Sequence, residues 1–234
     1  MKTVRYLLLV AAAVAGCQSW REGRSVQDMD IGGKLLTTLD LSAYRGLTNL
    51  DCWGNRLTNL DVSVCTNLTD LLCGGNDLMS LDLSHNTSLD ILRCDRNQLS
   101  KLDVVANTNL QWLSCSRSPL TNLDLSANTN LQRLFCGDNH LTSLDVTPCT
   151  KLQKLHCGGN QLSQLDLSAC ANLVEVNCDS NRLSVLDISA NTNLVLVNAR
   201  KNPLAEIAVW WSPPTDIPPM VRIYYDGKPV LRNK

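Results

Sequence analysis

Apolar and polar positions follow one pattern along most of this chain, and the pattern repeats every 21 residues. Each repeat contains a triplet of Leu, Asp and an apolar residue, and the triplets begin at Leu39, Leu60, Leu81, Leu102, Leu123, Leu144, Leu165 and Leu186. Seven cysteines keep the same step: Cys52, Cys73, Cys94, Cys115, Cys136, Cys157 and Cys178. Such self-similarity predicts a solenoid, in which every repeat forms one coil of a stack.

One full repeat, residues 131–151, predicts the structure of a coil. Leu134 and Cys136 alternate with polar or exposed neighbours, which indicates a short strand with one buried face. Equivalent strands of successive coils are expected to stack in parallel, ~4.8 Å apart. An Asn stands three residues after the Cys position in seven repeats, where its amide can satisfy the backbone groups of a turn. Ser118-Pro119 replaces it in the fourth repeat and predicts a weaker turn there.

The first eleven residues of the repeat match the leucine-rich-repeat signature LxxLxLxxNxL, with Cys in place of the third Leu. With Leu-Asp-Leu-Ser-x-Asn-Thr in its second half, the repeat resembles the cysteine-ladder repeats of bacterial surface proteins of the internalin type. The resemblance covers about residues 35–203. It implies an α/β-type, β-dominated repeat solenoid: a right-handed leucine-rich-repeat superhelix with parallel strands on its concave face, little helix, and a protein partner bound on that face.

The start of the chain predicts a lipoprotein signal peptide over residues 1–16. Lys2 and Arg5 precede an apolar run over residues 6–15 that is too short to span a membrane. The following Val-Ala-Gly-Cys17 resembles a bacterial lipobox, which implies cleavage before Cys17 and lipid on its thiol. Gln18 then implies the outer membrane or the cell surface if the cell is Gram-negative. The alternative is an ordinary secretory signal in which Cys17 is incidental.

The segments that flank the repeats are expected to close the ends of the stack. Residues 17–34 are polar and predict a tether and partial cap, while residues 204–234 predict a C-terminal cap. Within that cap, residues 221–225 precede Asp226-Gly227, which is typical of a tight β-hairpin turn.

Composition and charge exclude several classes of function. The formal charge is −1, and removing Lys2 and Arg5 leaves 21 − 2 = 19 basic against 22 acidic residues, a charge of −3. No basic block predicts a nucleic-acid partner. No nucleophile motif, metal triad or phosphate loop occurs, so we expect neither an enzyme nor a cofactor or metal. His156 adjoins Cys157, but neighbouring strand residues point to opposite faces. Glu175 is interpreted as isolated.

Three ladders of polar residues have structural interpretations. The cysteines that alternate with inward Leu residues are expected to be buried, reduced thiols. Cys65, Cys149 and Cys170 share a second row with Asn86 and three other Asn residues, and a disulfide between Cys149 and Cys170 stays open. The Asp residue of each triplet is expected to be stabilised by Ser or Thr hydroxyls three residues earlier and by backbone N–H groups. A row of bound cations is the alternative.

Residues that vary among the repeats point to one candidate surface. The outward strand positions include an apolar track flanked by arginines, a composition typical of protein interfaces. This candidate site consists of Trp53, Leu72, Ile91, Arg93, Trp112, Arg133, Phe135 and His156, with Arg96 and Arg117 beside it. A protein partner is favoured. Carbohydrate stacking on Trp53 and Trp112, a structural envelope lipoprotein, and a merely scattered or cap-covered set of surface residues are the alternatives.

Overall fold

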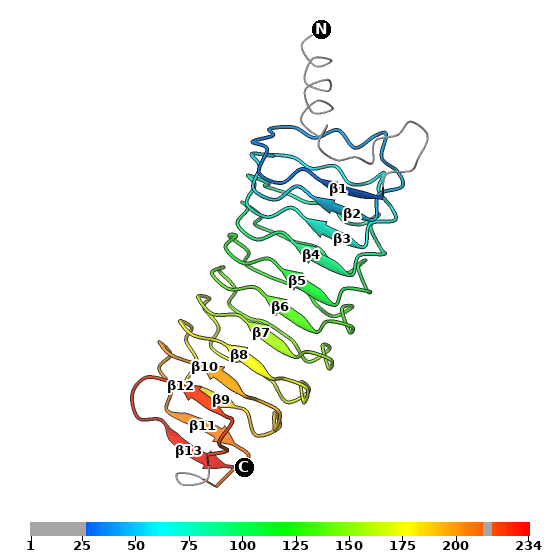
Figure 1. Cartoon of the computed structure of the whole chain (residues 1–234). Helices are drawn as coiled ribbons and strands as arrows, with labels where there is room; N and C mark the ends of the chain where they lie inside the picture. Colours follow the sequence, from blue (N-terminus) through cyan, green and yellow to red (C-terminus); the bar gives the residue numbers. More distant parts are fainter. Residues whose placement is uncertain (1–26, 213–216) are drawn as a thin grey trace.

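The computed structural model describes residues 27–212 and 217–234, and Cys17 with the signal peptide lies outside them. Short parallel strands form two sheets in this part of the chain (Figure 1). The main sheet contains ten of them: β1 (Asp28–Asp30), β2 (Asn49–Asp51), β3 (Asp70–Leu72), β4 (Ile91–Arg93), β5 (Trp112–Ser114), β6 (Arg133–Phe135), β7 (Lys154–His156), β8 (Glu175–Asn177), β10 (Leu196–Asn198) and β12 (Arg222–Tyr224). The second sheet joins β9 (Val185–Asp187), β11 (Glu206–Val209) and β13 (Val230–Asn233).

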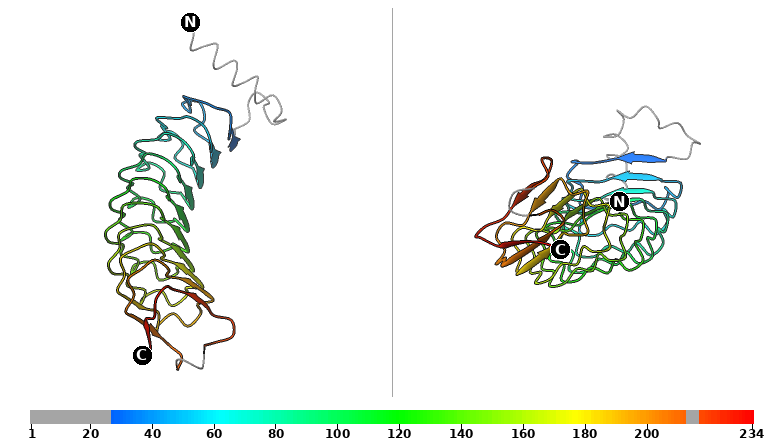
Figure 2. Two further views of the ribbon diagram at one scale, coloured as in Figure 1. Left: turned by 90° about the vertical axis from the view of Figure 1, so that its left-hand side faces the viewer. Right: turned by 90° about the horizontal axis from the view of Figure 1, so that it is seen from below.

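The register of the main sheet follows the 21-residue period. Trp112 pairs with Arg133, Leu113 with Leu134 and Ser114 with Phe135, so each side chain faces its equivalent in the next coil. The central residue of every strand from β2 to β8 is fully buried, as Leu113 and Leu134 illustrate. The described residues contain no helix, and the stack curves with the main sheet on the inside (Figure 2). The predicted leucine-rich-repeat solenoid is confirmed.

The Asn residues of the turns hold neighbouring coils together. The Nδ2 of Asn139 donates to the carbonyls of Cys136, 3.0 Å away in its own coil, and of Cys115, 3.1 Å away in the preceding coil. Its Oδ1 accepts the N–H of Leu120 at 3.2 Å. Three buried backbone groups are thereby satisfied by one side chain, which explains why the residue recurs. Ser118 takes this place in the fourth repeat and donates a single long bond, 3.4 Å, to the carbonyl of Asn97.

A second buried row mixes Asn with Cys. Asn107 is fully buried and donates its Nδ2 to the carbonyls of Asn86 and Leu83 in the preceding coil. Where Cys fills the row, its thiol takes over that bond: Cys170 points at the carbonyl of Cys149, 3.7 Å away. All cysteines of the described residues are free and buried. The disulfide left open for Cys149 and Cys170 is therefore not formed, because the two thiols point along the stack at carbonyls rather than at each other.

The Asp row forms a series of tight turns. The Oδ1 of each Asp accepts the N–H two residues ahead, as in the 2.9 Å bond from Ser84 to Asp82. The backbone N–H and the hydroxyl of Ser84 hold the pKa of Asp82 below its ordinary value. The donors are thus at the second residue after each Asp, which corrects the expectation of hydroxyls three residues before it. No cluster of metal-ligating side chains occurs among the described residues.

Both ends of the stack add strands to the solenoid. Met29 and Ile31 are buried and β1 pairs in parallel with β2, so residues 28–31 form part of the first coil. The prediction of a hairpin in residues 204–234 is wrong. β12 pairs in parallel with β10, whereas β13 pairs in parallel with β11. The turn at Asp226-Gly227 therefore joins two different sheets and continues the solenoid by one more coil. No helix capable of crossing a bilayer occurs in the part of the chain that the structure describes.

Candidate functional site: the inner face of the main sheet

The main sheet displays two rows of outward side chains on the inside of the curve. The first strand position carries Ile91, Trp112 and Arg133 in β4 to β6, and the third position carries Arg93 and Phe135 in β4 and β6. The third-position row continues into the neighbouring coils with Leu72 in β3 and His156 in β7. Trp53 lies two residues after the end of β2, on the same side of the chain as Asn49 and Asp51. All eight predicted site residues therefore share this face.

Two tryptophans and two arginines form a continuous stack along the sheet. The guanidinium of Arg93 lies 5.1 Å from the ring of Trp53 and 5.4 Å from that of Trp112. Arg133 contacts the same Trp112 ring from the next coil, at 5.2 Å. Cation–π contacts of this kind hold a planar guanidinium in place while leaving its N–H groups available. We call these four residues the Trp–Arg stack.

The stack continues through aromatic contacts into a charged cluster. The rings of Trp112 and Phe135 are 6.2 Å apart, and Phe135 meets His156 edge-on at 4.7 Å. His156 Nε2 lies 2.8 Å from Glu175, which also binds Lys154 at 3.0 Å. Glu175 was interpreted from the sequence as isolated, and that interpretation is wrong. Because β7 and β8 pair in register, it lies beside both basic residues.

Electrostatics at this cluster favour the ionised carboxylate. Burial acts to raise the pKa of Glu175, but hydrogen bonds from Lys154 and His156, together with their charges, hold it below its ordinary value. Sequence reasoning missed this residue because its partners come from another coil. The 19-residue separation of His156 and Glu175, two less than the repeat, is the signal that could have found it.

The aromatic residues of this face are half-buried instead of fully exposed. Trp53, Trp112 and Phe135 pack on one another or on the arginines, and only Arg133 among the eight is exposed. Leu72 and Ile91 are also half-buried beside them. The expected apolar track is therefore a preformed, ordered surface. Ordering these side chains before a partner arrives reduces the entropy lost on binding.

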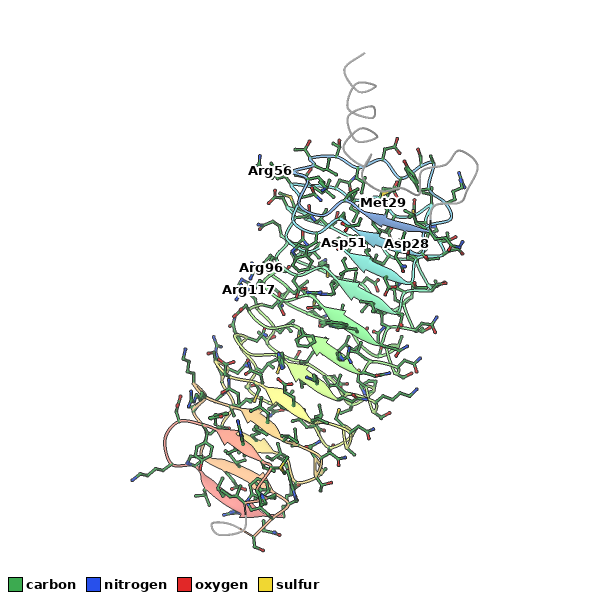
Figure 3. The ribbon with its side chains drawn as sticks, viewed as in Figure 1. Asp28, Met29, Asp51, Arg56, Arg96 and Arg117 are labelled. Carbon is green, nitrogen blue, oxygen red and sulfur yellow. The ribbon has the colours of Figure 1, made fainter. Side chains whose placement is uncertain are left out.

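Two further arginines border the face in strained turns. Arg96 and Arg117 have φ of 54° and 59°, where Gly54 and Gly75 stand in earlier coils. Figure 3 shows both arginines along one edge of the stack, just after the strands. Arg117 binds Asp138 at 3.2 Å. A left-handed backbone is costly for a residue with a side chain, so the coil alone does not favour arginine here.

No protein-family model and no curated protein matches the chain. Among solved structures, it is similar to the functional domain of InlJ from Listeria monocytogenes, which includes a cysteine ladder. The identity is 32%, over 79% of this chain and 49% of that one, with a TM-score of 0.64. Internalin C2 from the same species is 26% identical over 74% of this chain and 80% of that one, with a TM-score of 0.67. YopM from Yersinia enterocolitica is 29% identical over 80% and 39%, with a TM-score of 0.65.

These comparisons define the class of protein. The chain is a leucine-rich-repeat solenoid with a cysteine ladder, and internalin-type proteins are among its structural neighbours. The resemblance inferred from the repeat is confirmed. The chain spans about half the length of the InlJ structure, 49%.

Proposed function

We propose that this chain is a non-enzymatic, lipid-anchored protein of the cell envelope that binds another protein through the inner face of its main sheet. The Trp–Arg stack is the observation that carries this proposal. Aromatic residues and arginine are the side chains most often found at the energetic centre of protein interfaces. Here they come from three successive coils and one flanking turn, and they are already packed in a single arrangement.

Charge supports a partner that presents acidic groups to the stack. Neither Arg93 nor Arg133 has an ion-pair partner among the described residues. A carboxylate is the group that a guanidinium binds most specifically, often through two hydrogen bonds.

The anchoring part of the proposal depends on Cys17. Cleavage before this residue and lipid on its thiol would hold the solenoid at a membrane, with the outer membrane or the cell surface as the site in a Gram-negative cell. The apolar run over residues 6–15 and the lipobox-like Val-Ala-Gly-Cys17 support this step. Envelope fractionation of the wild type and of Cys17→Ala tests it, because only the wild type should remain in the membrane fraction after a salt wash.

A crosslinking experiment on whole cells tests the binding surface. Surface accessibility is measured first, and partners are then captured with the wild type, Trp112→Ala, Arg133→Glu and the exposed control Lys101→Glu, which lies away from the main sheet. We expect one partner to be captured by the wild type and the control but by neither stack variant. A partner captured equally by all four proteins would show that binding uses another surface. No captured partner would favour a structural envelope lipoprotein.

A further inference from the structure

A polar groove runs beside the Trp–Arg stack, at the edge where the strands of the main sheet begin. Its volume is about 450 Å³, and it crosses four coils. One side is formed by the residues directly before β4, β5 and β6, which are Asp90, Gln111 and Gln132. The other side is formed by residues two positions earlier in the coils, which include Asn109, Asn130 and Lys151. Every lining side chain carries a hydrogen-bonding group.

Hydrogen bonds already fix the direction of several of these groups. Gln132 Nε2 donates to Gln111 Oε1 at 2.8 Å, and Lys151 Nζ donates to Asn130 Oδ1 at 2.7 Å. Asn109 and Asn130 each donate Nδ2 to a Thr carbonyl of the preceding coil, at 3.2 and 3.1 Å. Each primary amide has two N–H donors and two acceptor lone pairs. Every amide therefore retains groups for a ligand, in a preset orientation.

Asp90 supplies the carboxylate of the groove. Its Oδ1 is buried and has no hydrogen-bond partner among the described residues. Burial, followed by the nearby charge of Asp70, raises the pKa of Asp90, although hydrogen bonds from the side chain and backbone of Gln111 act to lower it. Because Oδ1 is covered by protein, a ligand hydroxyl would donate to the other carboxylate oxygen, Oδ2.

The groove is specific to the middle of the stack. Residues equivalent to Asp90, Gln111 and Gln132 are Thr48 and Thr69 in earlier coils, Gln153 in the next coil, and Val174 and Val195 beyond it. A coil thus forms equally well with Thr or Val at this position. The architecture of the repeat does not demand the carboxylate and amides of coils β4 to β6, so another requirement must account for them.

We propose that this groove is a binding site for a neutral saccharide. Sugar hydroxyls both donate and accept hydrogen bonds, which matches a lining of amides and one carboxylate acceptor. An anion is disfavoured because Asp90 repels it and the one lining ammonium, on Lys151, is already hydrogen-bonded to Asn130. The volume lies within the ~300–1,000 Å³ that small-ligand sites occupy. The site is separate from the protein-binding surface proposed above and does not depend on it.

The test is titration of the full chain with four neutral tetrasaccharides: maltotetraose, cellotetraose, mannotetraose and chitotetraose. We expect at least one to bind in calorimetry at millimolar concentration. Asp90→Ala should weaken that binding at least about tenfold, since a hydrogen bond to a charged group is lost. Gln132→Ala should weaken it as well. Gln153→Ala is the matched control, because Gln153 continues the same row without lining the groove, and its affinity should equal that of the wild type.

Two results would overturn the proposal. The first is the absence of binding by all four sugars, and the second is equal affinity in the wild type, Asp90→Ala and Gln132→Ala. Circular dichroism of each variant confirms that the solenoid is intact, and the two groove variants provide independent readings if one of them unfolds. Arg133→Glu should leave sugar binding unchanged. Failure of the protein-binding proposal is thereby distinguished from failure of this one.

Discussion

The indole of Trp53 lies directly on Gly74, the residue at the equivalent position of the next coil. A Cβ at Gly74 would be 2.1 Å from Cζ3 of the indole, and Gly74 itself is buried. The absence of a side chain at this position lets the indole extend along the stack toward β4. It thereby reaches Arg93, whose guanidinium lies 5.1 Å from the ring. One glycine thus positions the first member of the Trp–Arg stack.

Gly74→Ala should displace the Trp53 ring without unfolding the protein. The ring can swing outward, so we expect a loss of about 1 kcal/mol or less, near the ~0.5–1 kcal/mol of one exposed cation–π contact. The indole N–H resonance of Trp53 in a ¹H–¹⁵N spectrum should shift. Gly32→Ala is the control, because the nearest atom to its Cβ would be 3.4 Å away. An unshifted Trp53 resonance in Gly74→Ala would contradict the packing described.

Trp112→Ala should reduce the free energy of unfolding by about 2 kcal/mol. Two cation–π contacts and one aromatic pair are lost, each worth on the order of 0.5–1 kcal/mol. The coil itself should persist, because the neighbouring Leu113 provides the buried side of β5. Urea unfolding measures the difference. A loss above about 4 kcal/mol would be typical of a core residue. It would mean that the main role of Trp112 is to stabilise the fold and not to form a binding surface.

The sequence predicted the repeated part of the fold well because the period also sets the register. A residue such as Leu134 pairs with Leu155 of the next coil simply because both hold the same place in the repeat. The C-terminal end lacked this information. Asp226-Gly227 signals a turn, but a local turn does not determine whether the next strand pairs with the previous one or with the stack. β13 instead pairs with β11.

The candidate surface was predictable in its residues but not in its contacts. The positions that vary among the repeats identified the face that carries Trp112 and Arg133. The alternation of side chains along each strand placed both residues on that same face. The packing of Arg93 between Trp53 and Trp112 depends on side-chain conformation across three coils, which no pattern along the chain specifies. The groove beside Asp90 could not be predicted from the sequence for a related reason. Its lining residues precede the strands, and the alternation of inward and outward side chains applies only within the strands.

Ser118→Asn should stabilise the solenoid. The amide would be placed to donate to the carbonyls of Cys94 and Cys115 and to accept the N–H of Leu99, as its equivalents do in other coils. Each net hydrogen bond contributes about 0.5–1.5 kcal/mol, so a gain of about 1–2 kcal/mol is expected in urea unfolding. Pro119 should not interfere, because Asn202-Pro203 makes the same bonds.

The reverse change provides the control for that prediction. Asn139→Ser should reproduce the weak turn of the fourth repeat and destabilise the protein by a similar or larger amount, since three buried backbone groups lose their partner. If Ser118→Asn left stability unchanged while Asn139→Ser lowered it, the fourth turn would already satisfy its backbone by another route.

Stability should fall steeply at alkaline pH because the cysteine ladder is buried. Burial raises the pKa of Cys52 to about 12 and places that of Cys136 well above its ordinary value. In the unfolded chain a thiol ionises near pH ~8.5. Between that pH and the folded pKa, the unfolded state has lost a proton that the native state retains. The stabilisation is therefore fully present below about pH 8 and is lost as pH rises, by ~1.4 kcal/mol per pH unit for each thiol.

Cys136→Ala tests this alkaline dependence. The variant should unfold more easily at neutral pH, but its stability should fall less steeply between about pH 9 and 11, by up to ~1.4 kcal/mol per pH unit. Ala199 occupies the same ladder position in a later coil, so alanine fits the coil. Leu134→Val is the control, because it lowers stability without removing a thiol and should leave the slope unchanged. Parallel pH curves for the wild type and Cys136→Ala would mean that the thiol ionises as readily in the native protein as in the unfolded chain.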